Sequence, residues 1–225
     1  MPFIKALSEH PDGVELLGIR PGLFQNWWPL TNALMGDPDS ELSVGEQELI
    51  GAYTAAVRGC THCYSAHYPI AIAYGIDPEV FEKLIHNFDE APLDDKMRPI
   101  LEYIHKLVKE PHKLMQRDAD AIFAAGWSER TLTDTVLICC LFMFMTTLMI
   151  GHGADETDMS DLGPMVTLFR AKTVYGEDGA TFEEPEALIQ KSIERFGEEA
   201  TNRAIARAQE LNFFEKMPQF NQAAE

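Results

Sequence analysis

Residues 43–74 read SVGEQELIGAYTAAVRGCTHCYSAHYPIAIAY, and this stretch decides the fold class. Ser43 and Glu46 form a capping box, in which the serine side chain accepts a hydrogen bond from an otherwise unpaired helix amide and the glutamate reaches back. Apolar residues recur at helical spacing from there to about Arg58. Gly59 allows the chain to turn. The stretch therefore predicts a helix, a tight break and a second helix.

The second helix is predicted to run from Cys60 to about Tyr74. In such a helix Cys60 and Cys63 lie one turn apart, and Cys63 and His67 are i and i+4, so that all three share a face. A sulfur at a helix N-terminus lies near unpaired amides and the positive end of the dipole, which favour its thiolate. A Cys-x-x-Cys pair in this place can cycle between dithiol and disulfide, and His67 can take a proton from Cys63.

Two further residues are candidates for the same site. Glu48 lies on the preceding helix, and if the two helices pack antiparallel its carboxylate can orient His67 or exchange a proton with it. Taken alone, Glu48 is equally typical of a solvated acid near a helix N-terminus. His62 points about 100° away from Cys63 on a regular helix, so it joins the site only at an irregular first turn and is otherwise a surface residue.

Outward from this stretch the pattern is helical, with few alternating β-branched segments. Helices are expected at about 94–110, 118–125, 128–150 and 186–214. The Pro- and Trp-containing stretch 21–38 is expected to be irregular, and residues 154–182 are polar and glycine-containing. We therefore predict an all-α fold, with a helical catalytic domain at 1–153 and a C-terminal, mostly helical extension at 154–225.

Composition excludes several classes of protein. The 225 residues include 18 Lys and Arg against 36 Asp and Glu, a formal net charge of -18. A nucleic acid or an anionic membrane surface is therefore an unsuitable partner. The longest apolar run, Val136 to Ile150, is shorter than the roughly 20 residues that cross a bilayer, which favours a central helix surrounded by protein. The N-terminal residues lack a signal-peptide pattern, so a cytoplasmic protein with reduced thiols is expected.

The four cysteines are too few for a disulfide framework. Cys139 and Cys140 are adjacent within an apolar run, where buried and inert thiols are expected. A structural zinc site at Cys60 and Cys63 needs further ligands and favours two separated pairs, so no metal is predicted.

The run Glu, eleven residues, Cys-x-His-Cys, three residues, His resembles the active site of the alkylhydroperoxidase D family, within the carboxymuconolactone decarboxylase superfamily. The matching residues are Glu48, Cys60, His62, Cys63 and His67. The resemblance is strong over 43–75 and continues weakly to Gly153. The peroxidase-related branch usually has Phe-Asn-x-Met-Asn-Arg in the later apolar helix, whereas this chain has Phe-Met-Phe-Met-Thr-Thr at 142–147.

The resemblance implies an all-helical, thiol-dependent peroxidase or disulfide oxidoreductase. In that family Cys63 would attack a hydroperoxide, Cys60 would resolve the sulfenic acid to a disulfide, and an external thiol or disulfide reductant would restore the dithiol. Neither a cofactor nor a metal is implied. The resemblance also implies homo-oligomers, either trimers or hexamers built as dimers of trimers.

Two other functions remain open at this point. The dithiol can belong to a redox-sensing or partner-binding protein that consumes peroxide stoichiometrically rather than catalytically. Alternatively, the chain can be a carboxymuconolactone-decarboxylase-type enzyme acting on a γ-lactone, although that branch does not depend on a cysteine pair.

Overall fold

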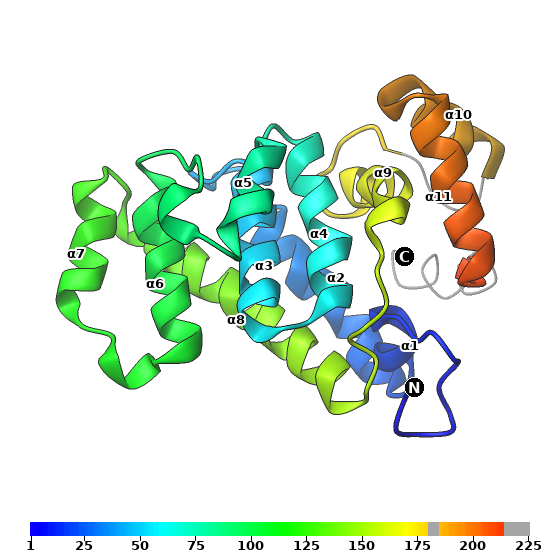
Figure 1. Ribbon diagram of the computed structural model, residues 1–225, viewed down its shortest axis with the longest axis horizontal. Helices are drawn as coiled ribbons and strands as arrows, with labels where there is room; N and C mark the ends of the chain where they lie inside the picture. The colour runs from blue at the N-terminus through cyan, green and yellow to red at the C-terminus, as the bar shows by residue number, and fades with distance from the viewer. Residues whose placement is uncertain (180–184, 214–225) are drawn as a thin grey trace.

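A computed structural model describes residues 1–179 and 185–213, and within them the chain forms helices and no strand (Figure 1). The α-helices are α1 (Gly13–Gly18), α2 (Pro21–Met35), α3 (Val44–Arg58), α4 (Thr61–Ala73), α5 (Pro78–Leu84), α6 (Met97–Lys109), α7 (Gln116–Ala124), α8 (Glu129–Gly151), α9 (Gly163–Thr173), α10 (Pro185–Phe196) and α11 (Glu198–Glu210). Short 3-10 turns lie at Phe88–Glu90, Pro111–Lys113 and Ser160–Leu162. The all-α prediction is confirmed.

Helices α3 and α4 form the central hairpin, as the sequence predicts. The Ser43 side chain accepts from the Glu46 amide, and the Glu46 side chain bonds back to the amide of Ser43. At the other end of α3, Gly59 adopts φ +78°, a left-handed conformation that glycine takes without steric cost. Cys60 then caps α4. The break is two residues long, so α3 and α4 pack side by side over their lengths.

The larger core lies where α3 meets α4, α6 and α8. Its side chains are mostly aliphatic and almost fully buried, and they include Ile50, Ile100, Leu101, Ile104 and Ile138. Figure 1 places α7 at one end of the molecule and α10 and α11 at the opposite end, with α8 running most of the way between them. The central hairpin is therefore supported from several sides, which fixes the side chains on α3 and α4.

Helix α8 is buried on one face only, which corrects the prediction of a helix surrounded by protein. Leu137 is 39% exposed and Phe144 42%, and Cys140 lies between them on the same face. Cys139 is buried as expected, but Cys140 is exposed, because a one-residue step on a helix turns a side chain by about 100°. At 23 residues, α8 alone among helices of the described segments is long and apolar enough to span a membrane, by length and composition.

The stretch at 21–38, expected to be irregular, contains the helix α2. Pro21 occupies the first turn, where its missing N–H is not needed. The aromatic residues then anchor the helix: the Trp27 ring stacks on Phe144 at 5.2 Å, and Trp28 packs edge-on against Phe169 at 5.6 Å. The expectation of an irregular stretch is wrong because proline and tryptophan are only local signals, whereas packing against the distant helices α8 and α9 stabilises this helix.

Beyond residue 153 the structure differs from the sequence prediction in two ways. Residues 154–182 contain α9, which begins at Gly163 with a proline in its first turn. The single helix expected at 186–214 is two helices, α10 and α11, because Gly197 adopts φ +85° and breaks the helical path. Residues 180–182 and Phe214 lie outside the described residues. The division into domains at residue 153 stays a prediction.

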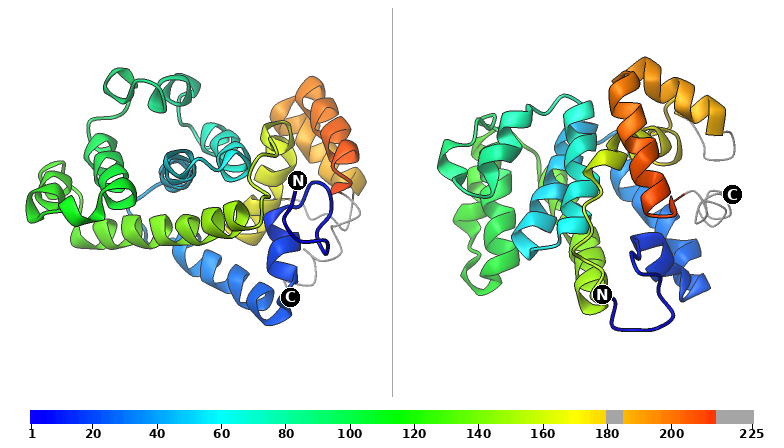
Figure 2. Two further views of the ribbon diagram at one scale, coloured as in Figure 1. Left: turned by 60° about the horizontal axis from the view of Figure 1, so that its bottom comes forward. Right: turned by 45° about the vertical axis from the view of Figure 1, so that its right-hand side comes forward.

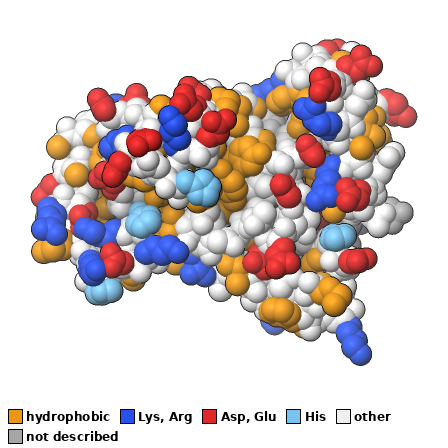
Figure 3. All heavy atoms as spheres, viewed as in Figure 1, with side chains coloured by type: hydrophobic (Ala, Val, Ile, Leu, Met, Phe, Trp, Pro, Cys, Tyr) orange, Lys and Arg blue, Asp and Glu red, His pale blue; other side chains and the backbone are white. Residues whose placement is uncertain are grey.

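A second core joins the C-terminal helices to the N-terminal one. Leu17 of α1, Leu168 of α9 and Ala208 of α11 are buried in one cluster. Figure 2 shows α9 beside α4 in both views. On the face in Figure 3, acidic and basic side chains are interspersed, and hydrophobic side chains gather between the two ends of the molecule. Of the helices after residue 153, α9 thus packs against α4, and α10 and α11 pack against α9.

Candidate active site

The two sulfurs of the Cys-x-x-Cys pair lie at the N-terminus of α4 and face each other. Cys60 Sγ and Cys63 Sγ are 2.9 Å apart, and the Cys63 amide donates to Cys60 Sγ at 3.4 Å. Both cysteines are free thiols and nearly buried, with exposed fractions of 1% and 5%. The structure therefore brings the pair together as a dithiol within reach of disulfide formation once the sulfurs move slightly closer.

The two thiols differ in acidity because they share a hydrogen bond. The hydrogen bond between the two sulfurs lowers the pKa of Cys60, although burial opposes that effect. The same bond, together with burial, raises the pKa of Cys63 well above its usual range. Asp155 raises the pKa of both thiols. In the resting dithiol the first negative charge thus forms on Cys60, while Cys63 holds the remaining proton.

Glu48 and His67 meet across the packed α3–α4 hairpin. His67 Nδ1 lies 2.6 Å from Glu48 Oε2, and Glu48 has no exposed surface. The Phe142 ring of α8 packs edge-on against the imidazole at 4.6 Å. The sequence-based expectation that Glu48 reaches His67 agrees with this geometry, whereas the reading of Glu48 as a solvated acid does not.

The second oxygen of Glu48 is held by two residues that sequence reasoning did not identify. Arg170 of α9 reaches Glu48 Oε1 with Nε at 2.9 Å and Nη2 at 2.7 Å. Tyr175, just after α9, donates its hydroxyl hydrogen to the same oxygen and lies 3.1 Å from Arg170 Nε. Glu48 is therefore enclosed by partners from α4, from α9 and from the segment after α9.

These contacts decide the charge of Glu48. Burial alone would raise its pKa, but the opposite charges of Arg170 and His67, together with hydrogen bonds from His67 and Tyr175, lower the pKa of Glu48 to about 2. Burial raises the pKa of Tyr175 well above its usual range, so its phenol stays protonated and donates. At neutral pH Glu48 is thus a carboxylate that only accepts hydrogen bonds.

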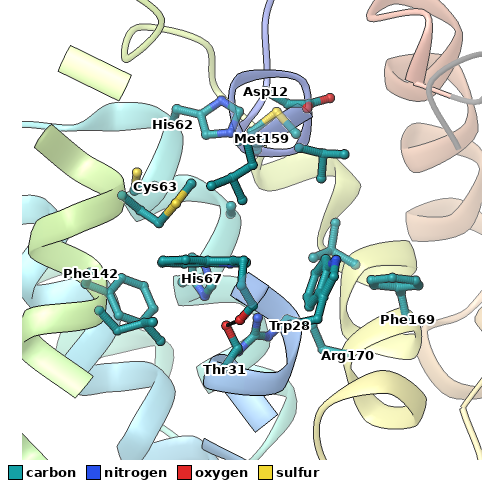
Figure 4. A pocket seen from close by; sticks show the side chains of 18 of the residues that line it. Asp12, Trp28, Thr31, His62, Cys63, His67, Phe142, Met159, Phe169 and Arg170 are labelled. Carbon is teal, nitrogen blue, oxygen red and sulfur yellow. Dashed lines mark hydrogen bonds between the residues drawn. The ribbon is translucent and has the colours of Figure 1, made fainter. Parts of the chain in front are cut away.

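A cavity of about 150 Å³ borders this cluster (Figure 4). Cys63, His67 and Arg170 line it, whereas Cys60 does not. Most of its other lining residues are apolar, and many of them are aromatic or sulfur-containing side chains. They include Trp27, Trp28, Met35, Phe142, Met145, Met159, Phe169 and Phe213. Of the two cysteines, Cys63 is therefore the one that a molecule in the cavity can contact, and the surroundings there are mainly apolar.

His62 borders the same cavity, on the side of Asp12. Both residues are nearly buried, and Figure 4 shows them at one end of the cavity, with Cys63 and His67 further along it. The His62 amide donates to the Asp155 carbonyl at 2.8 Å, and this hydrogen bond joins the first turn of α4 to the chain that follows α8. Although His62 and Cys63 diverge on the helix, α1 and the 154–159 segment enclose both.

The remaining cysteines lie apart from the site. Burial raises the pKa of Cys139 to about 11, so this thiol stays protonated at neutral pH. Within residues 1–179 and 185–213, no three His, Cys, Asp or Glu side chains are grouped so that they could hold a metal ion.

Arg170 escaped prediction because its partner is 122 residues away in the sequence. The available signal was weak: Arg170 follows a buried run, Thr167 to Phe169, on a helix whose first turn carries a proline. A single basic residue in an apolar helical face indicates a buried ion pair, but the sequence does not identify the partner.

Comparison with known proteins agrees with this fold. The carboxymuconolactone decarboxylase family model matches residues 21–98, which contain the α3–α4 hairpin and also α2. No curated protein matches the chain.

Two solved structures are similar to it. One is described as an alkylhydroperoxidase core, an uncharacterized peroxidase-related protein from Ralstonia eutropha. It is 26% identical with a TM-score of 0.60, over 66% of this chain and 78% of the other. The other is an uncharacterized peroxidase-related protein from a Silicibacter species, which is 20% identical with a TM-score of 0.55. The match covers 62% of this chain and 73% of the other, and it supports the fold alone. Residues 21–98 therefore resemble the carboxymuconolactone decarboxylase family, and the chain shares the helical fold of the alkylhydroperoxidase core protein from Ralstonia eutropha.

Proposed function

We propose that this protein is a thiol-dependent peroxidase that reduces organic hydroperoxides at Cys63. The geometry that supports this proposal best is the placement of the two sulfurs: Cys63 lines the apolar cavity and Cys60 lies 2.9 Å from it, outside the cavity lining. A hydroperoxide with an apolar group fits those walls. An external thiol or disulfide reductant is the second substrate, and no cofactor is required.

The reaction begins with the dithiol. His67 takes one proton from the thiol pair and becomes an imidazolium beside the Glu48 carboxylate. The remaining proton moves from Cys63 to Cys60 across their hydrogen bond, which leaves the thiolate on Cys63. This sulfur attacks the outer oxygen of the hydroperoxide, the O–O bond breaks, and the alkoxide takes the proton from His67 to leave as an alcohol.

The second half-reaction forms the disulfide. Cys60 attacks the Cys63 sulfenic acid, the S–O bond breaks, and the hydroxide leaves as water with the Cys60 proton. In sum, one hydroperoxide and two thiols give an alcohol, water and a disulfide. Exchange with an external dithiol then returns two electrons and two protons to the pair.

Substitution of each cysteine tests the proposal. With dithiothreitol as reductant and cumene hydroperoxide as oxidant, Cys63→Ser should reduce turnover to the background rate. Cys60→Ser should accumulate a sulfenic acid or mixed disulfide at Cys63, detected as a mass increase on its peptide. Cys140→Ser, an exposed cysteine outside the site, is the matched control and should keep full activity. Unimpaired turnover in Cys63→Ser would overturn the mechanism.

A dithiol switch is the second candidate, and the burial of both sulfurs favours considering it. A switch would form the same disulfide but consume about one equivalent of peroxide per chain and then stop, even with excess dithiothreitol. Repeated turnover under these conditions distinguishes the enzyme from the switch.

A further inference from the structure

The hydrogen bonds around Glu48 dictate where the proton of His67 can reside. His67 Nδ1 and Glu48 Oε2 are 2.6 Å apart, so one of the two atoms carries a hydrogen. An ionised carboxylate has no hydrogen to give, which makes Nδ1 the donor and leaves Nε2 of the neutral ring with a free lone pair. A protonated Glu48 would donate to Nδ1 instead, and the ring proton would then be on Nε2.

Arg170 and Tyr175 decide between these two arrangements. Glu48 has no exposed surface, so water cannot stabilise its charge. Its charge is balanced by the Arg170 guanidinium through two contacts on Oε1, and Tyr175 donates to the same oxygen. Among the described residues, His67 is the partner of Oε2.

We propose that Arg170 and Tyr175 are positioning residues that keep Glu48 anionic and thereby place the His67 proton on Nδ1, leaving Nε2 as the base. Both residues come from the chain after residue 153, outside the segment that matches the family model. The catalytic consequence rests on the proposed peroxidase function, but the position of the proton does not. Glu48 is then a fixed anion, and His67 alone carries protons to and from the thiols.

Arg170 is itself held in place by its surroundings. Its Nη2 lies 3.4 Å from Met35 Sδ of α2, and its guanidinium lies 5.5 Å from the centre of the Tyr175 ring. Tyr74, which directly follows α4, packs edge-on against that ring at 5.4 Å. These contacts from α2 and from the end of α4 leave the guanidinium directed at Glu48.

The experiment measures the tautomer of His67 directly. Protein labelled with 15N at histidine gives two-bond proton–nitrogen correlations whose pattern distinguishes Nδ1–H from Nε2–H, and His67→Gln identifies the signal. In the wild type, the neutral ring should carry its proton on Nδ1. Arg170→Gln should move the ring toward Nε2–H, Arg170→Lys should keep the wild-type tautomer, and Tyr175→Phe should shift it in the same direction as Arg170→Gln but less.

Tyr53→Phe is the matched control. Tyr53 also bonds a histidine through its hydroxyl, His105 Nδ1 at 3.0 Å, but this pair lies outside the cavity lining. The control should alter the His105 signal and leave that of His67 unchanged. Because loss of the buried Arg170 charge can unfold the chain, circular dichroism checks each variant, and Tyr175→Phe decides the question if Arg170→Gln is unfolded.

Peroxidase kinetics give the second readout. Arg170→Gln should lower kcat/KM at neutral pH by roughly 10- to 100-fold, as loss of an orienting partner typically does, with substantial recovery in Arg170→Lys. A folded Arg170→Gln or Tyr175→Phe with an unchanged His67 tautomer, or a wild-type ring protonated on Nε2, overturns the proposal. If the wild type shows no turnover, the proposed peroxidase function fails, while the tautomer result still decides this inference.

Discussion

Glu48 is a charged side chain without exposed surface, and its charge is balanced by groups from other parts of the fold. A charge that is buried and paired binds protons less readily in the folded chain than in the unfolded chain. The pKa of Glu48 falls from 4.5 to about 2 on folding. The unfolded state therefore takes up a proton at a pH where the folded state does not, and protonation favours unfolding.

This difference predicts a specific loss of stability in acid. The contribution of Glu48 is fully present above about pH 4.5, where both states are ionised, and disappears as pH falls toward about 2. Its size is about 3 kcal/mol from the linkage relation. Urea unfolding of the wild type across this window should show a steeper fall in the free energy of unfolding than Glu48→Gln does. All other carboxyl groups are common to both proteins, so parallel curves would contradict the prediction.

At the scale of helices, the approach of α8 to α3 determines where the His67 ring can lie. Gly51 faces Phe142, and a Cβ atom on Gly51 would lie 2.2 Å from Phe142 Cζ, closer than any real contact. The same Phe142 ring packs edge-on against His67. Because Gly51 on α3 has no side chain, the Phe142 ring fits between α3 and α8 and packs against His67.

Gly51→Ala should consequently affect both the core and the site. Forcing a methyl group into this contact displaces Phe142 and should destabilise the protein by about 1–3 kcal/mol, as overpacking typically does. It should also lower peroxide turnover, because the ring against His67 moves. Gly22→Ala is the control, since a Cβ there meets nothing within 4 Å. Equal melting temperatures for the two variants would show that α8 adjusts without cost.

The hairpin was predictable from sequence because its signals are local. The Ser43 cap, the left-handed Gly59 and the spacing from Cys60 to His67 each act over a few residues, and the structure follows them. Helices α2 and α9 were missed because they are stabilised by packing on distant elements. For the same reason Glu48 was identified as a candidate, while Arg170, 122 residues away, was not.

At the scale of the whole molecule, α8 leaves an apolar stripe exposed. Leu137, Cys140 and Phe144 recur at intervals of three and four residues and so share one face. The family resemblance predicts homo-oligomers, and this stripe is the face where a second copy of the chain can bury apolar surface.

Leu137→Glu should therefore weaken self-association, and Leu137 is preferred to Phe144 because the Phe144 ring stacks on Trp27. In sedimentation velocity, the wild type should migrate as an oligomer at micromolar concentration, and the variant should shift toward the monomer because a charge at the interface is costly to bury. Met115→Glu is the control, because Met115 is also an exposed apolar residue but lies just before α7, away from the stripe. A monomeric wild type would contradict the prediction.

The contacts of Arg170 and Tyr175 with Glu48 also determine when, during synthesis, the site is first complete. Domains generally fold from the N-terminus as the chain leaves the ribosome. Arg170 is the 122nd residue that the ribosome adds after Glu48, so it is made long after both cysteines have emerged. We expect the cysteine pair of the nascent chain to lack a correctly oriented His67 until α9 packs against α4 and brings Arg170 to Glu48. A fragment that stops before residue 170 would contain Cys60, Cys63 and His67 but neither Arg170 nor Tyr175. Such a prematurely terminated chain should therefore be a poor peroxidase even though it contains both thiols.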